Sequence, residues 1–199
     1  MLGTIYLRLW CVPFIMVLGM APVAAQDGVL SQINMGVLAH NVPILGDQKE
    51  HGVDLNGEAQ FVSPVPQSWV SDAGPRWRWL VTPRPTLGFL ANTNGYTSQL
   101  YASLTWTVDL NTGGFLWPDN TVFLGIGFGP SYNTGHVKSR EGNHLSLGSN
   151  VLFRESLELG WRITPVLSIS AYLDHSSNAG LASQNDGLSN LGIRVGYHF

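Results

Sequence analysis

The sequence has few charged residues and almost no cysteine. Asp, Glu, Lys and Arg make up 12% of its 199 residues, against about 25% in an average soluble protein. Its 10 Lys and Arg and its net charge of −3 cannot form the basic surface that neutralises several phosphates, which excludes nucleic acid as a partner. The one cysteine, Cys11, provides neither a disulfide framework nor a thiolate metal site.

The histidines do not follow the spacing of metal ligands. Besides one histidine discussed below, they are scattered along the chain, and we predict neither a metal site nor a cofactor. They are His40, His51, His136, His144 and His198.

Long hydrophobic runs are also missing, except at the N-terminus. Arg8 precedes an apolar stretch from Leu9 to Met20, and Val23-Ala24-Ala25 supplies a small-residue cleavage pattern. We interpret residues 1–25 as a signal peptide that is cleaved before Gln26. A membrane anchor is the less favoured alternative, because the run is interrupted by proline and is shorter than the ~20 residues of a spanning helix. Since no later stretch reaches about 18 apolar residues, a mature membrane protein would have to be a closed β-barrel.

The mature sequence alternates apolar and polar residues with a period of two, which predicts β-strands. Eight segments of about ten residues show this pattern, the length that a tilted strand needs to cross a bilayer. We predict that residues 26–199 form one domain, an all-β, eight-stranded antiparallel transmembrane β-barrel. The strands are expected at 29–40, 51–62, 84–92, 97–108, 120–131, 148–162, 165–177 and 188–199.

The alternation assigns a polar lumen and an apolar outer wall. Four charged side chains are expected to pair with one another inside the barrel, namely Asp54, Arg154, Glu158 and Arg194. Aromatic residues at segment ends fit the girdles of a membrane barrel; they are Trp106, Trp117, Tyr132 and Trp161. A soluble lipocalin-like barrel would place the apolar face inward. The C-terminal Gly196-Tyr197-His198-Phe199 resembles the ending of bacterial outer-membrane barrels and favours a transmembrane barrel over a soluble one.

The pattern does not explain the segment 63–83. It is rich in proline and tryptophan and falls on the periplasmic side of the predicted barrel. Short turns are expected on that side.

Polar residues interrupt the lipid face at the end of the seventh predicted strand. Continuing its apolar positions by twos brings His175 and Ser177 to the lipid side, and the same parity places Ser189 beside them on the next strand. Polar groups turned toward lipid indicate a functional site, unless they lie near the headgroups, where water can hydrogen-bond to them. Parity alone does not decide between a functional site and an interfacial position. A serine and a histidine on one strand face can supply the nucleophile and general base of acyl transfer.

Several stretches resemble the outer-membrane lipid A 3-O-deacylase family, also called acyloxyacyl hydrolase-like proteins. The residues from Asp174 to Leu181, with their His-x-Ser-Asn core, are the most specific of them. Similar residues extend over nearly the whole mature chain. The resemblance implies a barrel of the bacterial outer membrane that hydrolyses the acyl ester at position 3 of lipid A, the membrane anchor of lipopolysaccharide, in the outer leaflet.

The resemblance also implies roles for individual residues. His175 would be the general base and Ser177 the nucleophile. The oxyanion would be stabilised by Asn178, Gly180 and Asn185. The family has an acidic residue fourteen positions after the histidine, and here that position is Ser189. Because the acid orients the imidazole and stabilises its charged form, this difference puts activity in question.

Three residues are candidates to replace the missing acid. Ser189 itself could accept the imidazole N–H as a neutral partner. Glu155 lies on the lipid face of the preceding strand, where we expect it opposite Ala171 or Leu173, so that it reaches His175 only diagonally. Asp186 lies in the last outward loop, where it could equally be an ordinary turn residue.

Two other functions remain open at this point. The first is a non-catalytic outer-membrane barrel, either an inactive relative or a surface-interaction protein. The second is an acyltransferase, which an outward-facing site disfavours because the acceptor would need shielding from water. The sequence leaves the oligomeric state open, a homodimer included.

Overall fold

The chain folds as a closed barrel of eight antiparallel strands, each paired with its neighbours in sequence. The computed structural model describes residues 28–110, 121–139 and 142–199; the expected signal peptide and Trp117 lie outside them. The predicted strands are confirmed to within three residues at either end. They are β1 (Leu30–Ala39), β2 (Val53–Phe61), β3 (Arg84–Asn92), β4 (Gln99–Leu110), β5 (Val122–Asn133), β6 (Val151–Arg162), β7 (Leu167–Ser177) and β8 (Leu188–His198).

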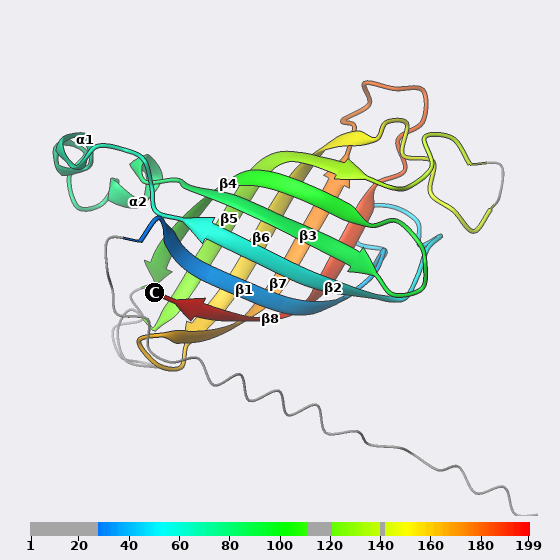
Figure 1. The fold of residues 1–199 in the computed structure, drawn as a ribbon. Helices are drawn as coiled ribbons and strands as arrows, with labels where there is room; N and C mark the ends of the chain where they lie inside the picture. Colours follow the sequence, from blue (N-terminus) through cyan, green and yellow to red (C-terminus); the bar gives the residue numbers. More distant parts are fainter. Residues whose placement is uncertain (1–27, 111–120, 140–141) are drawn as a thin grey trace, which may run out of the picture.

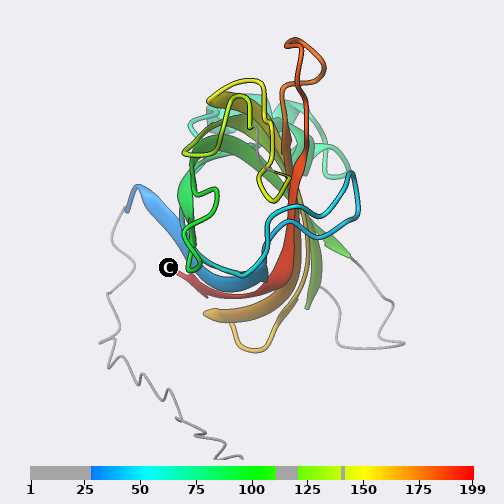
Figure 2. The same cartoon turned by 90° about the vertical axis from the view of Figure 1, so that its right-hand side faces the viewer.

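Pairing of the first strand with the last closes the sheet. β1 runs antiparallel to β8, from Gln32 opposite His198 to Ala39 opposite Leu191. The start of β1 and the C-terminus therefore lie at the same end of the barrel (Figure 1), and the view along the barrel in Figure 2 shows the complete ring. A closed ring leaves no strand edge with unpaired backbone groups, as a hydrocarbon environment requires.

The two faces of the wall differ in polarity as predicted for a membrane protein. Along β6, Leu157 and Leu159 point outward and are exposed, whereas Arg154 and Glu158 point inward and are buried. The exposed large apolar side chains follow the outward positions of the other strands as well. The soluble lipocalin-like alternative is therefore wrong, since it needs the apolar face inside.

A network of buried charges fills the lumen. Nη1 and Nη2 of Arg194 donate to the two carboxylate oxygens of Glu58 at 3.1 and 3.0 Å, and Nη2 also donates to Glu158 at 3.0 Å. Nη2 of Arg154 donates to the hydroxyl of Tyr172 at 2.7 Å and lies 3.4 Å from Asp174. The expected pairing among the four lumen charges is thus confirmed for Arg194 with Glu158, but not for Arg154, which pairs with Asp174. Two of their partners, Glu58 and Asp174, were not among the predicted charges.

The fourth predicted lumen charge, Asp54, pairs at the outer end of the barrel. Its carboxylate accepts a hydrogen bond from Nδ2 of Asn92 at 2.9 Å and lies 2.9 Å from Nδ1 of His40. The imidazole of His40 is fully buried between Asp54 and Glu50. Asp54 therefore connects β2 to the outer loops and not to the two arginines.

Glu50 joins three outer loops to one another. Its carboxylate lies 3.1 Å from Nε2 of His40 and accepts the backbone N–H groups of Thr97 and Leu145, each at 3.1 Å. Burial favours the neutral form of His40, but the hydrogen bonds to Asp54 and Glu50 outweigh it and raise the pKa of His40 to about 9. Burial would also raise the pKa of Glu50, but its hydrogen bonds to His40, Thr97 and Leu145 lower that pKa to about 2. Both groups are therefore charged at neutral pH.

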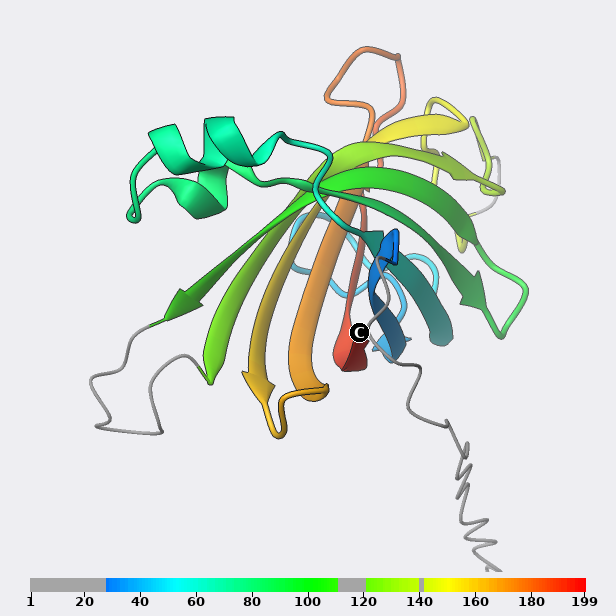
Figure 3. The same ribbon diagram turned by 60° about the vertical axis from the view of Figure 1, so that its left-hand side comes forward.

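Two short helices occupy the segment that the strand pattern left unexplained. α1 (Gln67–Asp72) and α2 (Arg78–Val81) lie between β2 and β3. Figure 3 shows them beside the barrel wall, at the end that holds the chain's C-terminus. Among the described residues, no helix is long and apolar enough to cross a membrane.

Raising the pH through about 9 should release the outer loops. Because the folded-state pKa of His40 lies above its ordinary value of 6.5, its ion pairs stabilise the loops fully below pH 6.5 and are lost as the pH rises through 9. Limited proteolysis of the reconstituted barrel with a protease active over this range should show more cleavage within 41–50 at pH 10 than at pH 7. Glu50→Gln should produce the same cleavage at pH 7, whereas Asp47→Asn, in the same loop, should not. Equal cleavage at both pH values would show that these ion pairs do not hold the loops.

Candidate active site

Three polar side chains occupy outward positions near the outer ends of β7 and β8. On β7, Asp174 and Ser176 point inward and are fully buried. The alternation of the strand therefore places His175 and Ser177 on the outer wall, where both are half-buried. Ser189 belongs to the same outward set on β8 and is directly opposite His175 in the strand pairing.

The imidazole of His175 is oriented by Ser189. Nδ1 of His175 lies 2.9 Å from Oγ of Ser189, and Ser189 is only 2% exposed, so water does not compete for this contact. When Nδ1 carries the proton and donates it to Oγ, Nε2 is left unprotonated. This is the tautomer that a general base needs. Ser189 thus takes the orienting position that the resemblance assigns to an acid.

Glu155 lies closer to His175 than the sequence analysis predicted. β6 pairs with β7 so that Glu155 is directly opposite His175, not opposite Ala171 or Leu173. The prediction was wrong because it assumed a tight turn over 162–165. In the structure the backbone N–H groups of Ile163 and Thr164 both donate to the carbonyl of Leu167, and this longer connection shifts the register. Glu155 therefore flanks the imidazole on the side away from Ser189, where its charge can act on the ring without orienting Nδ1.

Ser177 lies at the end of β7, opposite Phe153 of β6. In the described part of the chain its hydroxyl makes no hydrogen bond, including none to His175. Hydrogen bonds between a nucleophile and its base are often long in substrate-free sites and shorten when substrate binds. The hydroxyl is thus open to a ligand that approaches from the outer wall.

The three oxyanion candidates have different surroundings. Nδ2 of Asn178 donates to the carbonyls of Leu147 and Gln184 at 2.8 and 2.6 Å, and its backbone N–H donates to Oδ1 of Asn185 at 2.9 Å. Its donors are therefore engaged in holding the loops. Gly180 is exposed, with a φ of +77°. Asn185 uses Oδ1 as an acceptor, and its Nδ2 group has no partner within the described residues, which leaves it available to a substrate.

The loop 41–50 covers this site from the outside, which the sequence analysis missed. The N–H of Val42 donates to the carbonyl of Ser189 at 2.8 Å, and Figure 2 shows the loop reaching across β8. Gly187 lies between this loop and the imidazole: a Cβ on it would lie 2.5 Å from Cε1 of His175 and 3.1 Å from the carbonyl oxygen of Leu45. Neither the alternation of apolar and polar residues nor a local sequence motif could have indicated this packing, because it joins residues that are far apart in the chain.

The carboxylate of Asp186 contacts residues of two other loops and, within the described residues, not His175. Its carboxylate lies 2.6 Å from Nζ of Lys49 and accepts the N–H of Ser146 at 2.8 Å. It links its own loop, between β7 and β8, to loop 41–50 and to the loop before β6, and so positions its neighbours Asn185 and Gly187. In the described ranges, no group of three His, Cys, Asp or Glu side chains is arranged to hold a metal ion.

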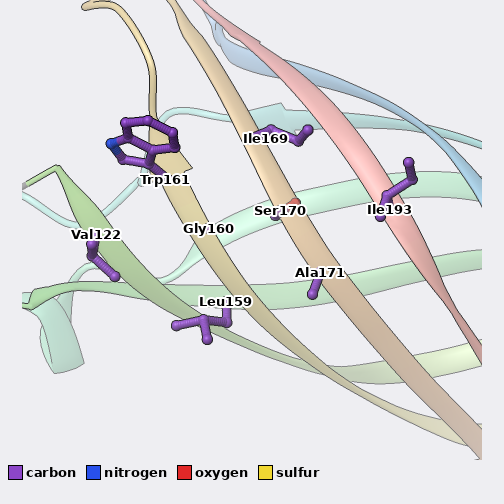
Figure 4. Close-up of a pocket in the computed structure, with 8 residues that line it drawn as sticks. All are labelled: Val122, Leu159, Gly160, Trp161, Ile169, Ser170, Ala171 and Ile193. Atoms are coloured by element: carbon purple, nitrogen blue, oxygen red, sulfur yellow. The ribbon is translucent and has the colours of Figure 1, made fainter.

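Two apolar hollows lie on the outer wall, one next to the site and one that extends from the middle of β7 toward the other end of the barrel. One, of about 350 Å³, is lined by Val151, Phe153, Asn178 and Leu181 among others, and so includes the cross-strand partner of Ser177 and the residue that follows it in the chain. The other, of about 330 Å³, surrounds Ala171, whose small side chain leaves space between larger neighbours (Figure 4). Ala171 is two outward positions from His175 on β7. The polar site thus adjoins one apolar hollow on the outer wall.

Comparison with known proteins identifies related sequences and folds. A family model described as Lipid A 3-O-deacylase (PagL) matches residues 69–198. The crystal structure of the outer membrane enzyme PagL has a TM-score of 0.60 and 16% identity, covering 85% of this chain and 100% of that chain. The N-terminal β-barrel domain of Pseudomonas aeruginosa OprF has a TM-score of 0.46 and 8% identity, covering 84% and 98% of the two chains. No curated protein matches the sequence.

Gly187→Ala should displace the imidazole of His175 from Ser189. The added methyl would lie within 2.5 Å of Cε1, and the loop carbonyl behind it prevents the methyl from moving away. Long-range ¹H–¹⁵N NMR of the detergent-solubilised barrel should show His175 with its proton on Nδ1 in the wild type and should show a loss of that preference in the variant. Gly142→Ala, at an open loop position, is the control and should leave the signal unchanged. A proton on Nε2 in the wild type would contradict the orientation described above.

Proposed function

Since the chain belongs to the lipid A 3-O-deacylase family, we propose that it hydrolyses the ester-linked acyl chain at position 3 of lipid A. The observation that carries this proposal is the 2.9 Å contact between His175 and Ser189 on the outer wall of the barrel. It orients a base beside Ser177, on the surface that faces membrane lipid. The substrate would be lipid A in the outer leaflet, approached sideways from the membrane.

In the proposed reaction, the acyl chain is first transferred to Ser177, and water then hydrolyses the acyl-serine. Nε2 of His175 takes the proton of the Ser177 hydroxyl as Oγ attacks the ester carbonyl carbon. Nδ2 of Asn185 donates to the resulting oxyanion. Collapse of this intermediate breaks the ester bond, and the imidazolium returns its proton to the departing 3-oxygen of the sugar. Water, deprotonated by the same imidazole, then hydrolyses the acyl-serine to a free fatty acid.

In this mechanism, Ser189 and Glu155 together replace the single carboxylate of a Ser-His-acid triad. A triad acid both orients the imidazole and stabilises the imidazolium. Here Ser189 provides the orientation, since it meets Nδ1 directly. Glu155, opposite His175 in the strand pairing, provides the negative charge. Their positions on opposite sides of one ring make the two contributions separable by mutation.

The apolar hollow beside Ser177 is suited to the acyl chain of the substrate. Phe153 and Leu181 line it and are exposed, so a hydrocarbon chain bound there would cover apolar surface on both sides. The chain would then enter the site from the lipid phase with its ester next to the nucleophile.

Ser177→Ala should abolish deacylation without changing the fold. Mass spectrometry of lipid A from cells that express the wild type should show loss of one 3-linked hydroxyacyl chain, and the variant should leave lipid A intact. Heat modifiability in gel electrophoresis checks that the variant barrel is folded. Intact lipid A with both proteins would favour a non-catalytic barrel, and deacylation by both would assign the nucleophile to another residue.

Placing an acid at position 189 and removing the charge of Glu155 should have opposite effects on kcat. Ser189→Glu should raise kcat, because a carboxylate would then both orient and stabilise the imidazolium. Glu155→Gln should lower kcat on the order of tenfold through loss of one nearby charge, and this loss should be smaller in the Ser189→Glu background. Kinetics on purified lipid A in detergent measure both, with Asp47→Asn as the charge control. An unchanged kcat in Glu155→Gln would remove this residue from the mechanism.

A further inference from the structure

The segment 63–83, called here the Trp segment, takes no part in the site described above. It joins β2 to β3 at the end of the barrel opposite the outer loops (Figure 3). Only Val70 of its two helices is buried. Its three largest exposed apolar side chains are Trp69, Trp77 and Leu80, which are 67%, 57% and 48% exposed. A group of exposed apolar side chains on such a short connection indicates a site of contact with a membrane or with another protein.

The Trp segment is held against the outer wall of the barrel. The indole Nε1 of Trp106 donates to the carbonyl of Leu80 at 2.9 Å, and α2 packs against β4. Trp106 belongs to the outward set of β4, together with Leu100 and Leu104, which are exposed to the membrane. α2 is therefore attached to the lipid-facing side of the strand, so the surroundings of the segment are those of the membrane boundary.

The charges of the Trp segment complement an anionic surface. Arg76 and Arg78 are exposed next to the tryptophans, and in the described stretches neither guanidinium has an ion-pair partner. Asp72 is the one acidic residue of the segment. Indole rings favour the boundary between headgroups and acyl chains because they are apolar with one polar N–H. Arginines beside them can pair with phosphates.

We propose that the Trp segment docks onto anionic phospholipid in the periplasmic leaflet of the membrane. Trp69, Trp77 and Leu80 enter the headgroup boundary, and Arg76 and Arg78 bind lipid phosphates. The continuity of the segment with the apolar wall through Trp106 favours lipid over a protein partner, because the wall beside it is already covered by lipid. The site at the other end of the barrel is not needed for this interaction, so the two proposals stand separately.

Depth-dependent quenching in nanodiscs tests this docking. The mature chain expected from residue 26 contains no cysteine, so Trp77→Cys gives a single position for an environment-sensitive fluorophore. In nanodiscs of phosphatidylethanolamine and phosphatidylglycerol, bromine atoms near the top of the acyl chains should quench this label strongly. The same label on Asn94→Cys, at an exposed outer loop, should be quenched at least several-fold less.

A second arm tests the charge contribution. Adding Arg76→Gln and Arg78→Gln to the labelled protein should shift the docking equilibrium on the order of tenfold toward the undocked state. The quenching should also fall in nanodiscs of phosphatidylcholine alone. Lys138→Gln, in an outer loop, is the matched control and should have no effect, and heat modifiability confirms folding of each variant.

Two results would overturn the proposal. One is quenching at position 77 no greater than at position 94. The other is quenching that is the same in anionic and neutral nanodiscs and unaffected by the arginine substitutions. A label that becomes shielded only as protein concentration rises would identify a second copy of the chain as the occupant and would likewise reject lipid docking.

Discussion

Closure of the sheet between β1 and β8 is the constraint on which the rest of the structure depends. In hydrocarbon every backbone N–H and C=O must be paired within the protein, and a ring of eight strands achieves this without a free edge. Once the ring is closed, side chains alternate strictly between lumen and lipid. One consequence is that Glu155, His175 and Ser189 form a row across three neighbouring strands on the outer wall.

The geometry of this row depends on loops outside the membrane. Glu50 holds three loops together, and the ion pair between Lys49 and Asp186 connects the first loop to the last. The first loop in turn covers Ser189 and confines Gly187 against the imidazole. The polar groups that face lipid are thus shielded by the chain itself, which reduces the free-energy cost of placing them there.

The two ends of the barrel present different side chains to the membrane. At the outer end, a few polar side chains lie beside an apolar hollow. At the other end, the Trp segment extends the apolar wall sideways through the hydrogen bond between Trp106 and Leu80. This arrangement gives a physical reason for the length of residues 63–83, which exceeds what a turn between two antiparallel strands needs.

The sequence by itself determined the strands, the two faces of the wall and the outward parity of His175, Ser177 and Ser189, because alternation with a period of two is a local property of the chain. The lumen position of the charged residues followed from the same parity, that of Glu58 and Asp174 included, but parity did not indicate which charges pair. Tertiary structure alone decided which residues meet. The register of β6 on β7 depended on the length of one turn and brought Glu155 opposite His175. The engagement of Asn178, the pairing of Asp186 with Lys49 and the cover over Ser189 depend on contacts between loops far apart in sequence. Such contacts arise only once the barrel has brought the ends of its strands together, so no local pattern encodes them.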